Sequence, residues 1–520
     1  MEAGWPGQML AALAPLLSVS PEHSNGSATS AEKALRTALR ACRTSIKNGQ
    51  RKTLAQVFYG TLLLRGRLSF ALDCVAIPSL PGPDPIEAGT GLTKDFNNFR
   101  VTALASVYVI HEHKKYFDHS NLDEEAIAEW LNFASNTIGQ SAIACIYNWC
   151  PSSHSWPSDP VKYLSVFHSI PLWLANTIIA SFPSLTVHRA FAESLNHPAP
   201  ACFRANLYKC TSLTALHSRM IIPCTPTRFS PSGFRVLGGA KPEVRGDALH
   251  QAGLFEVQDE GSQMIALATG AKRGSVVVDL CCGRGGKSLH LADMMSVYGE
   301  ETDAGSMLLC HDVDPGTLRE AQRRMTRPGL FSEAVKVRYV CSESTEAIST
   351  MEGSKNLTGG RGGDVAFTSG KPSTETIDIS AILNALGTLA DIVLVDAPCS
   401  SLGTLRRGPN VRWEISPDSL TIFPPLQKSI LEQAVHLVKP GGVLVYATCT
   451  FNGAECEGVR NWFDAAFGAK FAPSPLAGAL GTGVMESLVP EDPGVSSVQL
   501  TPNEHGTDAF YITRWVRREQ

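Results

Sequence analysis

The chain has 520 residues, of which 43% are hydrophobic and 18% are charged, and its formal net charge is -4. At about 150 residues per domain, this length predicts two to four domains with at least one large core, which excludes a short peptide scaffold. The ordinary balance of hydrophobic and charged residues excludes a fibrous repeat and a wholly disordered chain. The 14 cysteines are irregularly spaced and contain no CxxC pair. This spacing favours free thiols in a reducing compartment over a zinc ribbon or a disulfide framework, and we expect no metal site.

The N-terminal residues carry none of the signals of a secreted or membrane protein. No apolar run reaches the roughly 18 residues that a membrane span needs, and an early one, residues 9–17, is interrupted by Pro15. Residues 1–30 contain no Lys or Arg, which argues against a secretory signal and a basic transit peptide. We expect no membrane partner and interpret residues 1–30 as a flexible tail, while cytoplasm, nucleolus and an organelle all stay open as compartments.

Residues 31–70 are strongly basic and show helical periodicity. They contain nine Lys or Arg and one Glu, a net charge of +8. Apolar residues recur every three or four positions on one face, and basic residues recur likewise on the opposite face. These basic positions, here named the basic stripe, are Lys33, Arg36, Arg40, Arg43 and Lys47. Both a solvated helix face and contact with nucleic-acid phosphates explain the stripe.

From residue 270 onward, short apolar runs alternate with helical patterns. The predicted strands are residues 275–280, 307–311, 336–341, 391–396 and 442–447. The predicted helices between them are residues 287–295, 315–325 and 426–438. This alternation predicts an α/β fold with a doubly wound parallel sheet, in which ligands bind at the carboxyl ends of the strands. Residues 353–376 are rich in Gly and Ser and are predicted to form a flexible insertion.

A glycine-rich turn follows the first predicted strand and opens a helix. It runs from Asp279 to Lys287 with the sequence DLCCGRGGK. Glycines let the backbone approach a ligand closely, and a helix N-terminus favours negative charge. The turn matches neither GxGxxG nor the phosphate-binding GxxxxGK(S/T) loop, so a structural turn and a nucleotide-like cofactor site are both open. Asp312 ends the next strand, where a carboxylate can bind a ribose, unless it caps the following helix, for which Asp314 lies closer.

Two cysteines follow neighbouring predicted strands. Cys399 lies just after the fourth strand and Cys449 just after the fifth. Most free cysteines are inert core residues, but a thiol at the ligand-binding edge of a sheet is a candidate nucleophile. Three arginines that follow Cys399 are predicted to bind phosphate or to lower a thiol pKa, with a solvated loop as the alternative. They are Arg406, Arg407 and Arg412.

These residues resemble those of the Nop2/Sun family of RNA cytosine-5 methyltransferases, which use S-adenosylmethionine. The resemblance covers residues 253–517 and rests on motifs that occur in the family's order: GLFEVQDEGSQ, DLCCGRGGK, DAPCSSLGTLRR with VRW shortly after, LQKSILEQAVHLVKPGGVLVYATCT, and DAFYITRW. Upstream, PACFRANLYK is similar to the family's small RNA-binding module. The basic stretch with LAQVFYGTLLLRGRLSFAL is similar to the NusB-like N-terminal domain of bacterial 16S rRNA cytosine methyltransferases.

The resemblance implies three domains after the tail. A helical NusB-like RNA-binding domain would span residues 31–180, and a small α+β RNA-recognition module would span residues 181–245 with Arg204 and Asn206 as RNA-binding residues. Residues 246–520 would form a Rossmann-like S-adenosylmethionine-dependent methyltransferase domain with the insertion at residues 353–376.

The resemblance also implies roles at the site. Cys449 would attack carbon 6 of cytosine, because carbon 5 is too poor a nucleophile to take a methyl group unaided. Cys399 would be the partner thiol that helps to release the product, and Asp396 would face both cofactor and base. S-adenosylmethionine would be held by Cys281, Cys282, Gly283, Arg284, Gly285, Gly286, Lys287, Asp312 and Asp396.

The chain departs from the family pattern at three places. The usual Ala-Ala-Pro before Gly-Gly-Lys is Cys282-Gly283-Arg284 here, which alters the shape and charge of the loop. The family's Asp near the adenine of the cofactor has no clear counterpart after the third strand. The usual Pro-Glu-Glu-Asn-Glu after the nucleophile is replaced by GAECE, residues 453–457.

Several functions fit these observations. RNA cytosine methylation by a monomer is favoured, with rRNA preferred to tRNA because of the N-terminal resemblance. A cofactor-binding rRNA assembly factor without activity is an alternative that the altered loop permits. A small-molecule methyltransferase or a nucleotide-dependent oxidoreductase follows from the sheet alone, since a fold does not decide a function.

If the basic stripe contacts RNA phosphates, changing three of its residues to Glu weakens RNA binding and flattens its dependence on salt. Each lost phosphate contact removes roughly 0.7 to 0.9 from the slope of log K against log salt concentration. Filter binding over a salt series measures this slope, and cofactor affinity is the control that stays constant. An unchanged slope would identify the stripe as a solvated helix face.

Overall fold

The computed structural model describes residues 102–108, 124–138, 140–148, 157–210, 212–237, 246–300, 305–327, 329–341, 377–408, 411–415 and 417–519, with isolated positions besides. The basic stripe and the predicted insertion at residues 353–376 lie outside these described residues. The chain divides into two compact units, and residues 405–417 join the N-terminal residues in the first of them.

The described part of the first unit is helical. Its helices are α7 (Glu124–Ile138), α8 (Gln140–Asn148), α9 (Pro160–Phe167), α10 (Leu172–Ser181), α11 (Leu185–Ser194) and α18 (Val411–Glu414). Sequence signals set their ends: Asp159 accepts a hydrogen bond from the Lys162 backbone at the start of α9, where Pro160 occupies the first helical position. No single described helix is long and apolar enough to span a membrane, although α9 and α10, bent by 120°, pass that test together.

The second unit begins with a small antiparallel sheet in the order β2-β3-β1-β4. Its elements are β1 (Cys202–Ala205), α12 (Leu213–Arg219), β2 (Cys224–Pro226), β3 (Gly233–Val236), α13 (Ala248–Gln251) and β4 (Phe255–Val257). Phe203, Phe234 and Phe255 are buried together in its core. These four strands and two helices form a small α+β module.

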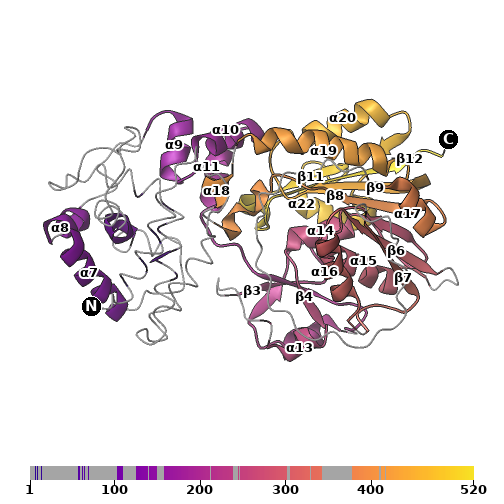
Figure 1. Cartoon of the computed structure of the whole chain (residues 1–520), viewed down its shortest axis with the longest axis horizontal. Helices are drawn as coiled ribbons and strands as arrows, with labels where there is room; N and C mark the ends of the chain where they lie inside the picture. Colours follow the sequence, from indigo (N-terminus) through magenta and orange to yellow (C-terminus); the bar gives the residue numbers. More distant parts are fainter. Residues whose placement is uncertain are drawn as a thin grey trace. The chain divides into compact units, whose positions relative to one another are not determined.

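The rest of the second unit is a large sheet in the order β10-β12-β9-β8-β5-β6-β7, with β11 paired to β12 (Figure 1). Its strands are β5 (Val276–Asp279), β6 (Ser306–Asp312), β7 (Val335–Cys341), β8 (Ala390–Asp396), β9 (Val438–Thr448), β10 (Phe471–Pro473), β11 (Ser497–Leu500) and β12 (Phe510–Arg517). The predicted parallel sheet is confirmed, because β5 to β9 pair only in parallel with one another. The strands after β9 pair antiparallel, which the sequence patterns did not predict.

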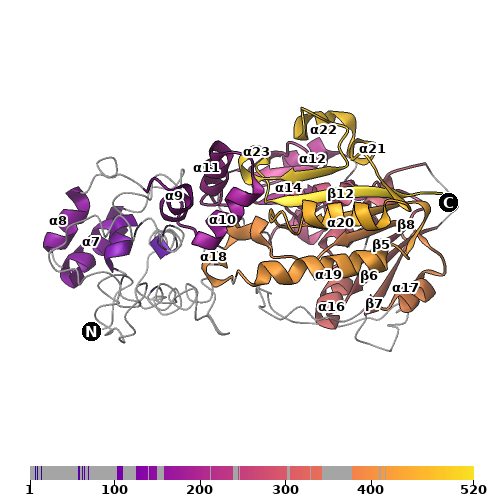
Figure 2. The same cartoon turned by 90° about the horizontal axis from the view of Figure 1, so that it is seen from above.

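Helices cover both faces of this sheet (Figures 1 and 2). The helices of the second unit are α14 (Glu260–Leu267), α15 (Gly286–Val297), α16 (Pro315–Met325), α17 (Ile379–Leu386), α19 (Ser419–Ala434), α20 (Glu457–Phe467), α21 (Ala477–Leu480), α22 (Thr482–Leu488) and α23 (Pro502–His505). One core packs α14, α15 and α16 on one face of the sheet, and a second core packs α17, α19 and α20 on the other.

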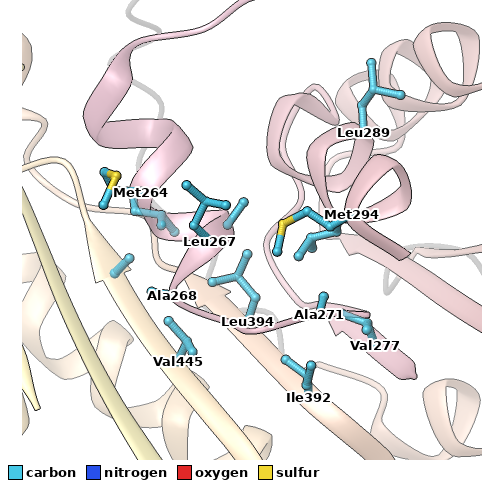
Figure 3. Packing of buried hydrophobic residues seen from close by; sticks show 14 of the residues in the cluster. Met264, Leu267, Ala268, Ala271, Val277, Leu289, Met294, Ile392, Leu394 and Val445 are labelled. Atoms are coloured by element: carbon cyan, nitrogen blue, oxygen red, sulfur yellow. The ribbon is translucent and has the colours of Figure 1, made fainter. Parts of the chain in front are cut away.

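Side-chain alternation along each strand supplies both cores. Val277 belongs to one core and Val278 to the other, because neighbouring residues of a strand point to opposite faces. In Figure 3, Met264 and Leu267 of α14 lie over the sheet beside Leu394. Strands buried on both faces need apolar residues at nearly every position, which explains why these strands read as continuous apolar runs.

The small module is joined to the large sheet by buried polar contacts. Arg204 on β1 donates to Asp293 on α15 at 2.7 Å and to Gln258 at 2.8 Å. Asn206 donates to the backbone carbonyl of Leu330 at 2.7 Å. Arg204 and Asn206 are both fully buried, so their side chains hold the module in place and are not exposed to RNA in this structure.

Removing the carboxylate of Asp293 tests this contact. Asp293→Ala leaves the buried Arg204 guanidinium without its charged partner, and we expect a loss of roughly 3 to 5 kcal/mol in the free energy of unfolding. Glu320→Ala is the matched control, because the Arg284–Glu320 ion pair is 47% and 49% exposed, and a surface pair contributes at most about 1 kcal/mol. Urea unfolding measures both variants, and equal losses would contradict the structural role of Asp293.

Candidate active site

The glycine-rich turn connects β5 to α15 at the carboxyl edge of the sheet. Gly283 and Gly285 have φ angles of 52° and 75°, which favour glycine. A Cβ on Gly285 would lie 3.0 Å from the backbone of Ala321, whereas a Cβ on Gly283 would meet no described atom within 4 Å. The turn is therefore packed on its inner side and open at Gly283, as a close approach to a ligand requires.

Asp312 stands beside this turn. Its carboxylate accepts a hydrogen bond from the Gly283 backbone at 2.9 Å. Asp314, and not Asp312, caps α16 by accepting from the Gly316 backbone at 2.7 Å. The helix-capping interpretation of Asp312 is therefore wrong, and Asp312 lies at the strand end where a ribose ligand is predicted.

The predicted cofactor loop carries two neutral thiols and one half-exposed, charged arginine. Burial raises the pKa of the Cys281 thiol well above its usual range. The pKa of Cys282 is also raised, by its hydrogen bond with the Cys310 thiol and by burial. Arg284 is half-exposed and pairs with Glu320 at 3.1 Å. Both cysteines therefore act as small neutral side chains at pH 7.

An ion pair joins the start of α15 to the end of β8. Lys287 Nζ lies 2.5 Å from Asp396 Oδ2, and both side chains are largely buried. Burial alone would lower the pKa of Lys287, but the carboxylate of Asp396 outweighs this effect and the net pKa is raised. Lys287 thus stays charged and holds Asp396 at the strand end.

The two strand-end cysteines meet at this edge. The Sγ atoms of Cys399 and Cys449 are 3.3 Å apart. The hydrogen bond with Cys399 lowers the pKa of Cys449. Burial and the charge of Asp396 oppose this shift, and the charge of Lys287 supports it. The same hydrogen bond, together with burial, raises the pKa of Cys399 well above its usual range. Of the two thiols, Cys449 is therefore the one that loses its proton more readily.

Tight backbone contacts hold the loop after β8 against the loop after β9. Gly403 donates its backbone N–H to the Cys449 carbonyl at 3.0 Å and accepts from the Ala509 backbone at 3.1 Å. A Cβ at position 403 would lie 2.0 Å from the Ala509 carbonyl oxygen, so only glycine fits there. Ser401 has a φ of 57°, a strained value for a residue other than glycine.

The three predicted phosphate-binding arginines belong to the first unit and differ in exposure. Arg407 is exposed and Arg406 is buried. Arg412 is fully buried and donates to Asn196 Oδ1 at 2.8 Å and to the Leu195 carbonyl at 2.9 Å. Burial lowers the pKa of Arg412 to about 10. Arg412 thus joins α18 to the end of α11 within this unit, and its side chain is not accessible to phosphate.

Two buried carboxylates lie near the site, and the sequence analysis assigned no role to either of them. Asp279 ends β5 and accepts from the Ser288 hydroxyl at 2.7 Å. Glu455 accepts hydrogen bonds from side chains of both cysteine loops. The sequence offered one signal for each residue. Asp279 is the first residue of the glycine-rich motif, and Glu455 falls in the altered GAECE segment.

Comparison with known proteins identifies a matching family model and several relatives of this chain. Residues 373–516 match the family model described as 16S rRNA methyltransferase RsmB/F. The resemblance to the Nop2/Sun family of RNA methyltransferases is thereby confirmed. A Bacillus subtilis (strain 168) protein named "Probable ribosomal RNA small subunit methyltransferase B" is 24% identical over 90% of both chains. A Synechocystis protein of the same name is 29% identical over 56% of this chain and 55% of its own length.

A solved structure shows the same fold. The crystal structure of PH0851 has a TM-score of 0.59 to this chain at 19% sequence identity, and the match covers 98% of both chains. The α/β fold with a Rossmann-like sheet is therefore confirmed.

The raised pKa of Asp279 predicts how the stability of the folded chain depends on pH. Burial raises its pKa from 3.8 to about 7 in the folded chain, so between these values the unfolded chain ionises while the folded chain stays protonated. The contribution of Asp279 to the free energy of unfolding therefore falls as pH rises from about 4 to about 7, by about 4 kcal/mol, and is constant above that range. Asp279→Asn keeps an acceptor for Ser288 but cannot ionise.

Urea unfolding of both proteins from pH 4 to pH 8 measures this difference. We expect the stability of Asp279→Asn relative to the unsubstituted chain to rise with pH over this interval. Parallel curves would show that Asp279 ionises normally.

Proposed function

We propose that this chain methylates carbon 5 of a cytosine in ribosomal RNA, with S-adenosylmethionine as the methyl donor and a covalent bond between Cys449 and the base. The observation that carries the proposal is the pair of thiols 3.3 Å apart at neighbouring strand ends, of which Cys449 has the lowered pKa. The relatives named as small-subunit rRNA methyltransferases support rRNA as the substrate class.

The residues around the glycine turn fit S-adenosylmethionine. The open backbone at Gly283 admits a ligand, and the Asp312 carboxylate lies beside it for the ribose hydroxyls. The loop from Cys281 to Lys287 would hold the remainder of the cofactor. When bound, the cofactor supplies an electrophilic methyl group on its sulfonium sulfur.

Cys449 solves the problem that carbon 5 of cytosine is a weak nucleophile. Its thiolate forms a bond to carbon 6, and the electrons of the carbon 5–carbon 6 double bond shift so that carbon 5 becomes nucleophilic. Asp396 ends β8 close to Cys449, where its carboxylate would accept a hydrogen bond from the base and orient the ring for attack. Lys287 fixes the position of Asp396 through their ion pair.

Product release requires the bond between Cys449 and carbon 6 of the base to break. The methylated base must lose its carbon 5 proton to a base, the carbon 5–carbon 6 double bond forms again, and Cys449 leaves as a thiolate. The Cys399 thiol lies within hydrogen-bonding distance of that sulfur. It therefore stabilises the departing thiolate by donating a hydrogen bond.

Substituting each thiol separates these steps. Cys449→Ala removes the attacking sulfur, so both methyl transfer and covalent RNA adduct disappear. Cys399→Ala keeps the attacking sulfur but removes the donor that assists release, so the protein accumulates as a denaturant-resistant adduct with RNA. Transfer of labelled methyl groups to rRNA and denaturing gels measure the two outcomes.

The control for thiol loss is Cys210→Ala, because Cys210 is a half-buried thiol in the small module. An adduct in Cys449→Ala that is absent from Cys399→Ala would reverse the two roles, as in the single-thiol scheme of DNA cytosine methyltransferases. Full activity in both variants would remove cysteine catalysis, and an unsubstituted chain that binds rRNA without methylating it would indicate an assembly factor.

A further inference from the structure

We propose that Glu455 is a positioning residue that holds the Cys399 and Cys449 loops at the spacing the two thiols need, an inference that rests on the proposed function. Glu455 touches neither sulfur atom. It acts through a network of buried hydrogen bonds, here named the thiol clamp, which consists of Ser400, Gln427, Thr450, Asn452 and Glu455.

The clamp joins the residue after one cysteine to the residue after the other. Ser400 follows Cys399, and its hydroxyl donates to Glu455 Oε1 at 2.5 Å. Thr450 follows Cys449, and its hydroxyl lies 2.9 Å from that of Ser400. Because a hydroxyl has one proton and Ser400 gives its own to the carboxylate, Thr450 must donate to Ser400. The two cysteine loops are therefore connected in series through Ser400 to the carboxylate.

Glu455 accepts three more hydrogen bonds. The Ser400 backbone N–H donates to Oε2 at 2.8 Å, and Asn452 donates to Oε1 at 3.0 Å. Gln427 on α19 donates to Oε2 at 3.1 Å and to the Pro398 carbonyl at 3.0 Å. The carboxylate thus binds the Cys399 loop on one side and the Cys449 loop on the other.

The burial of the clamp makes these bonds strong. Gln427, Thr450 and Glu455 are fully buried. A buried carboxylate is stable only when donors replace the water it has lost, and hydrogen bonds to a charged acceptor are about twice as strong as neutral ones. Four donors converge on Glu455, so the loops have one favourable arrangement.

The Cys399 loop depends on this support more than the Cys449 loop does. Cys449 directly follows β9, which is paired on both sides by β8 and β12. Cys399 lies beyond the end of β8, in an irregular segment that includes the strained Ser401. The clamp therefore sets where Cys399 lies relative to a fixed Cys449.

The sulfur spacing itself can be measured without RNA. The diazene oxidant diamide takes two electrons and two thiol protons from a nearby pair, becomes a hydrazine, and leaves a disulfide between the two sulfurs. Its rate at the Cys399–Cys449 pair, read by mass spectrometry of the full chain, reports how closely the thiols are held.

Glu455→Ala is expected to slow this disulfide formation and to lower kcat by about 100-fold, because a displacement of about 1 Å at a reacting group has that effect. The KM for S-adenosylmethionine is expected to stay unchanged, because Glu455 lies outside the cofactor loop. Glu455→Gln keeps the side-chain length and one acceptor oxygen, and should recover part of both losses. Glu457→Ala is the matched control, since Glu457 is 50% exposed and contacts Arg460 and Tyr511.

If Glu455→Ala does not fold, Ser400→Ala and Thr450→Val test the same link by removing one hydroxyl each. Both substitutions break the same chain of hydrogen bonds. The double variant should therefore lose no more of the diamide rate or of kcat than either single variant does. Unchanged diamide rates in these variants overturn the proposal, as does a lower kcat with an unchanged diamide rate. If the unsubstituted chain does not methylate RNA, the proposed function fails, while the diamide comparison still decides the role of Glu455.

Discussion

The hydrogen bond between the sulfur atoms of Cys399 and Cys449 is the interaction on which the candidate site depends. It forms because β8 and β9 are parallel neighbours, so the loops that follow them meet at one edge of the sheet. The close approach of Gly403 to the Cys449 carbonyl holds the two loops together. This contact makes two identical side chains different, because it lowers the pKa of Cys449 and raises the pKa of Cys399.

Buried polar groups fix this edge of the sheet in one arrangement. Arg204 and Asp293 join the small module to α15, Lys287 and Asp396 join α15 to β8, and Glu455 joins the two cysteine loops. Each of these charges is largely removed from water and is stabilised by its partners. The site is therefore coupled to the packing of the whole second unit, although few of these residues face a ligand.

The altered cofactor loop has neutral thiols and an open side at which a ligand can approach. Cys281 and Cys282 have raised pKa values and remain neutral, so Cys282 replaces the small apolar residue of the family without adding charge. Arg284 directs its charge outward to Glu320. The departure from the family motif thus changes the inner packing of the loop and its outer surface, while the glycine at position 283 keeps the ligand side open.

The sequence by itself determined the parallel strands β5 to β9 and the strand-end positions of Asp312, Cys399 and Cys449, because strands buried on both faces form continuous apolar runs that are visible locally. Only the tertiary structure showed the antiparallel strands after β9 and the roles of Arg204, Arg412 and Glu455. A charged residue has the same local pattern whether it faces solvent or a buried partner. The partner of Arg204 lies 89 residues away in sequence, so the fold, and not the neighbouring residues, decides whether its charge is buried or exposed.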